Sequence, residues 1–172
     1  MTTERSAARI YVGTYAKYNS GSIKGAWLDL EDYADKDAFL AAARALHSYE
    51  ADPELMFQGW EGIPEGMVSE SHIDEGVWEW LALGEDQRTI VAAYRCGADT
   101  TDAIGVILDS FQGAHDSERD WAYGYVDSTG MLEGVPEFAR NYFDYTAFAR
   151  DAFMGDVVGV RYEGHLYVFS NY

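Results

Sequence analysis

The stretch SESHIDEGVWEWLALGED, residues 69–86, contains six carboxylates, two tryptophans and no lysine or arginine. Four of its apolar residues recur at the helical spacing i, i+4, i+7 and i+8: Ile73, Val77, Trp80 and Leu81. This period predicts an amphipathic helix that begins after Ser71 as the N-cap, with Asp74 in the third helical position. Carboxylates four residues apart repel each other by about 0.2–0.5 kcal/mol, so helix stability does not explain the two such pairs here.

The excess of acids extends beyond this stretch. From Ala45 to Gln87 there are eleven acids and no lysine or arginine, and the chain of 172 residues has 30 Asp and Glu against 12 Lys and Arg, a net charge of −18. The hydrophobic share of 48% excludes a disordered acidic tail. Nucleic acid and anionic membranes are excluded as direct partners, because binding either requires basic patches. The charge indicates a positively charged partner.

The regions on either side of residues 69–86 contain strand patterns. Residues 8–30 alternate apolar and polar around Tyr18-Asn19-Ser20-Gly21, which predicts a β-hairpin, and residues 35–50 have the helical spacing of a helix crossing its face. Residues 55–60 could form a third strand. Gly62, Pro64 and Gly66 then indicate a domain boundary near residue 68.

The second half of the chain is predicted to be helical and to end in strands. Helices are expected over residues 85–95, 102–111 (capped by Thr100 or Thr101) and 116–128. An aromatic segment follows Pro136, and residues 156–171 predict a second hairpin that turns at Glu163-Gly164. The fold class is therefore α+β.

Catalytic and metal-binding patterns are weak. The four histidines are far apart and form no metal-binding motif, and no glycine-rich phosphate loop occurs. Residues 35–37 begin like a calcium loop but lack its glycine and terminal glutamate. We therefore expect no metal, no cofactor and no enzymatic activity. A carboxylate pair of the glycosidase type and a generic halophilic surface remain alternatives.

The single cysteine, Cys96, permits no internal disulfide and indicates a reducing compartment. The N-terminal residues lack the apolar region of a signal peptide, and no apolar run is long enough to span a bilayer. We expect a cytoplasmic protein.

Carboxylates at this density could imitate DNA. Duplex DNA carries one negative charge per about 1.7 Å of axis, so thirty carboxylates correspond to about 50 Å of duplex. On a compact globule with a radius of gyration near ~16 Å they would face every direction, whereas a rod of small domains could align them. The acids that we expect to stand in for phosphates are Glu50, Asp52, Glu54, Glu61, Glu65, Glu70, Asp74, Glu75, Glu79, Glu85, Asp86, Asp109, Asp116, Glu118, Asp120 and Asp127.

Several blocks of the sequence, in order, resemble the ArdA family of antirestriction proteins. They are RIYVGTYAKYNSGSIKGAWLDL (9–30), DPELMFQGWEGIP (52–64) with SES (69–71), FQGAHDSERDWAYGYVDSTG (111–130), and MLEGVPEFARNYFDY (131–145) continued by TAFARD (146–151). The last of these blocks occupies the place of the family's antirestriction motif. The resemblance covers nearly the whole chain.

The resemblance implies a DNA mimic that is not an enzyme. It implies an elongated, curved dimer that occupies the DNA-binding groove of Type I restriction–modification enzymes, at their methyltransferase core, in a bacterial host that a mobile genetic element has entered. The implied chain has three small domains: an α+β domain over residues 1–68, an acidic helical middle domain over 69–108, and an α+β domain over 109–172. Pairing in the third domain implies that the following residues lie at or near the dimer interface: Met131, Leu132, Val135, Pro136, Phe138, Tyr142, Phe143 and Tyr145.

Two interpretations of Tyr142 and Phe143 stay open. They could lie at the dimer interface, or they could equally belong to the core of their own domain. The chain also departs from the family where residues 102–115 hold few acids and where Gly124 and Arg119 interrupt an acidic helix. An acidic scaffold for another basic DNA-binding protein is the alternative function, and a small carbohydrate-active enzyme is the third.

Overall fold

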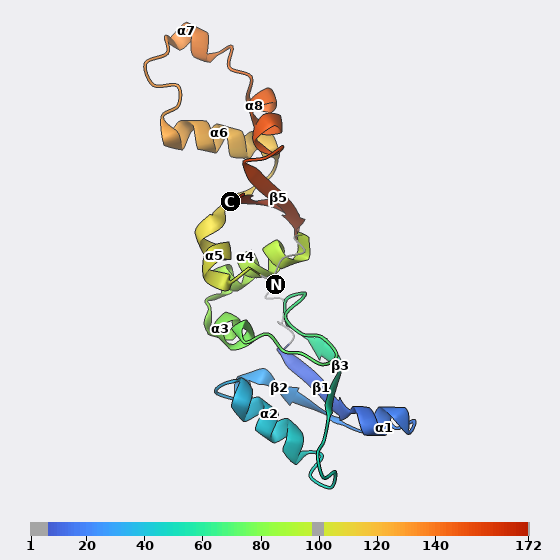
Figure 1. The fold of residues 1–172 in the computed structure, drawn as a ribbon. Coiled ribbons are helices and arrows are strands. Elements are labelled where there is room, and N and C mark those ends of the chain that lie inside the picture. Colours follow the sequence, from blue (N-terminus) through green and yellow to red (C-terminus); the bar gives the residue numbers. More distant parts are fainter. Residues whose placement is uncertain (1–6, 98–101, 172) are drawn as a thin grey trace. The chain divides into compact units, whose positions relative to one another are not determined.

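The computed structural model describes residues 7–97 and 102–171, and the chain divides into two compact units at Arg88/Thr89 (Figure 1). The expected caps Thr100 and Thr101 lie outside the described residues. Both units combine helices with a three-stranded antiparallel sheet, so the α+β class is confirmed.

The sheet of the first unit has the strand order β2-β1-β3, with β1 (Arg9–Thr14) between β2 (Ala26–Asp29) and β3 (Leu55–Glu61). β1 pairs with β2 as predicted, and residues 55–61 form the third strand. The expected tight turn is wrong: a short helix, α1 (Tyr15–Asn19), connects β1 to β2. Thr14 caps α1 by accepting a bond from the Lys17 amide, which ends the strand pattern there.

Helix α2 (Lys36–Ala45) lies against this sheet and follows a 3₁₀ turn, η1 (Leu30–Asp32). Asp35 caps α2 by accepting from the Ala38 amide at 2.8 Å. Phe39 on α2 is fully buried, and its ring lies 6.5 Å from that of Phe57 on β3. The predicted helix across the sheet is therefore present.

The acidic stretch 69–86 becomes helical later than its spacing predicts. Helix α3 spans Gly76–Ala82, and Ser71 is not its cap. Ile73 instead forms a β-bridge with Val68, and the Asp74 amide donates to the Met67 carbonyl at 2.8 Å. These backbone bonds compete with the first helical turn, so the N-cap prediction at Ser71 is wrong.

The second unit has the strand order β4-β6-β5, formed by β4 (Phe111–His115), β6 (His165–Ser170) and β5 (Val157–Tyr162). The β5–β6 hairpin is confirmed, with positive φ at Glu163 and Gly164. β4 was not predicted, and Phe111, expected to end a helix, begins this strand.

Helices α4 (Glu85–Gly97), which crosses the division between the units, and α5 (Ile104–Ser110) match the predicted helices closely. The others are α6 (Glu118–Thr129), α7 (Glu137–Arg140) and α8 (Tyr145–Ala152). Figure 1 shows α7 within the loop that connects α6 to α8. Trp121 on α6 is buried and stacks on Phe148 of α8 at 6.1 Å between ring centroids. This contact joins the two helices above the sheet.

The three-domain division predicted from the sequence is not confirmed by the contacts within the chain. The segment expected to form a middle domain, residues 69–108, is shared between the two units. Trp78 in this segment bonds Tyr33 of the first unit, whereas Tyr94 packs its ring 4.9 Å from Phe169 of the second. The division at 68 and 108 therefore stays a prediction.

Candidate functional site

Most of the acids expected to face a partner are solvent-exposed. Eight lie in the first unit, in the loop before β3, between β3 and α3, on α3 itself, or in the first turn of α4: Asp52, Glu54, Glu65, Glu70, Glu75, Glu79, Glu85 and Asp86. Five lie in the second unit: Asp109, Asp116, Glu118, Asp120 and Asp127. The remaining three, Glu50, Glu61 and Asp74, are half-buried.

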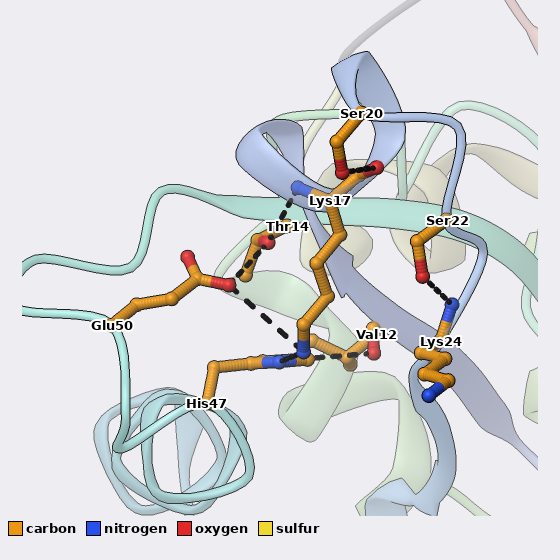
Figure 2. Close-up of polar contacts among 8 residues, drawn as sticks. All are labelled: Val12, Thr14, Lys17, Ser20, Ser22, Lys24, His47 and Glu50. Atoms are coloured by element: carbon orange, nitrogen blue, oxygen red, sulfur yellow. Dashed lines mark hydrogen bonds and ion pairs between the residues drawn. The ribbon is translucent and has the colours of Figure 1, made fainter.

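These three half-buried acids make bonds that hold the first unit together. Glu50 accepts a bond from the Thr14 hydroxyl at 2.8 Å and lies 3.9 Å from the Lys17 ammonium (Figure 2). Glu61 forms an ion pair with Arg9 across the edge of the sheet at 2.7 Å. Asp74 accepts from the Gly76 amide at 2.7 Å and so begins α3. Their carboxylates are structural parts of the unit.

The Glu50 carboxylate belongs to a small polar cluster at the end of α2. Figure 2 shows the Lys17 ammonium beside Glu50 and the imidazole of His47. Lys17 Nζ lies 2.5 Å from His47 Nδ1, and an ammonium can only donate. Nδ1 is therefore the acceptor, and Nε2–H is left to donate to the Val12 carbonyl at 3.3 Å. The cluster fixes the chain after α2 to β1.

The tryptophans of the acidic stretch bring two acidic segments together. Trp78, which lies between Glu75 and Glu79 on α3, donates its indole N–H to the Tyr33 carbonyl at 3.1 Å. Its ring lies 5.9 Å from the buried Phe39. This anchor places α3 beside residues 29–37, a segment with five further carboxylates.

These five carboxylates were absent from the expected set, which in the first unit kept to the stretch from Ala45 to Gln87 without lysine or arginine. All five are exposed: Asp29, Glu31, Asp32, Asp35 and Asp37. Their density, five in nine residues, is a signal that the sequence does contain. The acidic surface of the first unit is therefore larger than the predicted one.

Several arginines are directed at backbone groups. The following donate to backbone carbonyl oxygens: Arg88, Arg95, Arg140 and Arg161. Arg119, the base within the acidic part of α6, instead lies over the ring of Tyr123 at 5.4 Å. These five arginines thus contact backbone carbonyls and an aromatic ring.

Some acids of the second unit have a local structural reason and others do not. Ser117 caps α6, and its hydroxyl donates to the Asp120 carboxylate at 2.7 Å, so Asp120 and Glu118 favour the start of the helix. Asp109 and Asp127 lie in the last turns of α5 and α6, where the helix dipole disfavours a carboxylate by about 0.3–1 kcal/mol. Helix stability does not explain these two.

The residues expected at a dimer interface divide by exposure. Four are exposed: Met131, Pro136, Phe138 and Tyr142, the last two at 73% and 86%. Four are half-buried: Leu132, Val135, Phe143 and Tyr145. Phe143 packs on Phe148 at 5.7 Å between ring centroids, so it belongs to the core of its own unit. Of the two interpretations, the core of the unit applies to Phe143. Tyr142 is too exposed to belong to that core.

Tyr145 also packs within the unit, stacked on Tyr123 at 3.9 Å between ring centroids. Both tyrosines line an open hollow of about 630 Å³ between α6 and the loop that carries α7. Glu133 and Arg140 lie on its far side. Within the same loop, the side chains of Phe138 and Tyr142 are exposed to solvent.

Among residues 7–97 and 102–171, no group of three or more His, Cys, Asp or Glu side chains is arranged to hold a metal ion. The helices in these ranges are all too short or too polar to cross a bilayer.

Comparison with protein families matches residues 10–167 to the family described as Antirestriction protein (ArdA). The match spans both units and every strand of both sheets except the terminal residues. A comparison with curated proteins returned no match. Because the family match covers well over half of the chain, the chain belongs to the ArdA family of antirestriction proteins, which act on restriction enzymes.

Proposed function

We propose that this antirestriction protein inhibits Type I restriction–modification enzymes by mimicking DNA and occupying the DNA-binding groove of their methyltransferase core. The observation that carries the proposal is the exposure of the acids in the expected set. Thirteen acids of the expected set are exposed, while four arginines donate to backbone carbonyls. Such a surface offers a cationic groove many fixed negative charges.

The mechanism follows from how proteins bind DNA. Lysines and arginines of a DNA groove gain affinity when they displace the counterions condensed on phosphates. Carboxylates held at a folded surface meet the same cations but present no base edges. Because phosphate contacts position DNA and base contacts specify its sequence, the inhibitor competes with every target sequence alike.

In this proposal, the protein acts as a homodimer in the cytoplasm of a bacterial host. The loop between α6 and α8 exposes Phe138 and Tyr142, together with Met131. Large aromatic side chains are enriched in the buried centres of protein interfaces. Pairing two chains through this loop doubles the number of carboxylates that one groove can meet.

The proposal is tested by competition for a purified Type I methyltransferase core. Labelled duplex bearing the recognition sequence, and a second duplex without it, are each bound to the core and titrated with this protein. We expect both to be displaced at about one dimer per core. If saturating protein displaces neither duplex, the proposal is wrong.

A further inference from the structure

Arg88 is the one lysine or arginine between Ala45 and Tyr94, so it lies within the most acidic part of the chain. Its side chain is only 16% exposed. An arginine on an acidic surface ordinarily lies in solvent and offsets nearby carboxylates. The burial of Arg88 indicates a different use.

The guanidinium of Arg88 closes the C-terminal end of α3. Its Nε donates to the Leu83 carbonyl at 3.1 Å, and its Nη2 donates to the Leu81 carbonyl. These oxygens lie where the last carbonyls of a helix have no partner within the helix. A cation at this end is also favoured by the helix dipole.

Trp80 adds a second connection between α3 and the first turn of α4. The guanidinium lies over its indole ring at 5.1 Å from the centroid. In return, the indole N–H donates to the Arg88 carbonyl at 3.4 Å. Trp80 itself is buried. The two residues therefore fix the turn between α3 and α4 from both sides.

The remaining nitrogen of the guanidinium reaches a third element. Nη1 lies 3.8 Å from the carboxylate of Glu31 on η1. Glu31 is 63% exposed, so this ion pair orients the acid at the surface and leaves most of its charge in solvent. One side chain thus contacts α3, η1 and the turn before α4.

Each of these elements carries exposed carboxylates. Glu79 lies on α3, Glu31 and Asp32 on η1, and Glu85 and Asp86 in the first turn of α4. Binding to a fixed array of cations requires that these charges keep their mutual positions, because a charge that must reorganise loses part of its contribution.

We propose that Arg88 is a positioning residue for antirestriction, which holds the carboxylates of α3, η1 and the first turn of α4 in the arrangement that the target's cations meet. This inference rests on the proposed function of DNA mimicry. Lysine cannot replace it, because the contacts require a planar fork that donates to two carbonyls and covers an aromatic face.

The charge and the geometry of Arg88 predict opposite effects of its substitution on binding to the target. This difference makes the inference testable. Arg88→Met makes the net charge more negative, from −18 to about −19, which favours binding to a cationic groove if total charge alone matters. Lys24→Met makes the same change of charge at an exposed residue of the same unit and is the matched control. Arg88→Lys keeps the charge and loses the fork.

Wild type and the three variants are compared for displacement of labelled DNA from the methyltransferase core at two salt concentrations, after circular dichroism has verified that each is folded. We expect Lys24→Met to bind as wild type does or more tightly. Arg88→Met and Arg88→Lys are expected to bind at least ~10-fold more weakly and with a smaller salt slope, since fewer cations are met at once. Equal affinity of Arg88→Lys and wild type would overturn the inference.

Amide hydrogen exchange separates this inference from the proposed function. In the two Arg88 variants we expect faster exchange at the amides of Leu83 and of residue 88, which donate to the Trp80 and Gly84 carbonyls, whatever the target is. If wild type displaces no DNA while exchange rises as expected, DNA mimicry is wrong but Arg88 still orders these acidic elements. Unchanged exchange in Arg88→Lys overturns the positioning role even if DNA is displaced.

Discussion

Glu50 and Glu79 belong to the same acidic region, but their surroundings differ. At the scale of single residues, Glu50 accepts from Thr14 and faces Lys17, whereas Glu79 is exposed on α3. Glu50→Gln is therefore expected to lower the free energy of unfolding by about 1–3 kcal/mol, because a half-buried hydrogen-bonded charge is lost. Urea denaturation measures this loss.

Glu79→Gln is the matched exposed change and should leave stability within about 0.5 kcal/mol of wild type. It is expected to weaken DNA displacement and to lower the salt slope by about one, which Glu50→Gln should not do. If both substitutions changed binding equally and stability not at all, the division of the acids into structural and partner-facing ones would be wrong.

Tyr142 and Phe143 are adjacent and have opposite environments. Tyr142→Glu alters a side chain that is 86% exposed, so the monomer should stay folded while the proposed dimer dissociates at least ~10-fold more readily. Sedimentation velocity at several concentrations measures the change. A dimer of unchanged affinity would place the interface elsewhere.

Phe143→Ala is expected to act on folding, since its ring packs on those of Tyr145 and Phe148. Because the side chain is only half-buried, a loss of about 1–3 kcal/mol is expected, below that of a fully buried phenylalanine. Thermal denaturation measures it. A stability equal to wild type would contradict the packing of this residue.

At the scale of elements, α6 carries a glycine that its backbone conformation does not require. Gly124 lies in the interior of the helix with no positive φ, and an added Cβ would meet only His115 Cε1 at 4.0 Å. Gly124→Ala should therefore raise the free energy of unfolding by about 0.5–1 kcal/mol. A melting temperature below that of wild type would show that the helix needs the glycine for another contact.

The elements that the sequence predicts well are those determined by local pattern. The helix at 85–97 and the hairpin at 157–170 have clear periods and turn residues of the expected kind. β4 could not be predicted, because it is short, contains Gly113 at φ +109, and depends on pairing with β6 more than fifty residues later. The burial of Ile73 was predicted correctly, but in a bridge to Val68 and outside the helix.

The exposure of most acids in the expected set was predictable, because charged residues are rarely buried without partners. Which acids are structural was not predictable, since Glu50 contacts Thr14 and Lys17 from more than thirty positions away. The acids of residues 29–37 were missed for a related reason: the bond from Trp78 to Tyr33 joins positions 45 apart.

At the scale of the whole molecule, the charge limits the shape that mimicry allows. A compact chain of this length has a radius of gyration near ~16 Å, whereas thirty carboxylates at the spacing of DNA cover about 50 Å. We expect small-angle scattering of the dimer to give a long, curved particle. A maximum dimension no greater than that of a compact globule of dimer mass would contradict the alignment of the acids.

The salt dependence of binding tests the central claim of DNA mimicry most directly. The dissociation constant of the methyltransferase core is measured for this protein and for a DNA duplex, each across the same range of salt concentrations. A mimic that meets the cations of the groove should show a slope of log affinity against log salt that is negative and of similar size to that of the duplex. An affinity that does not change with salt would contradict the account.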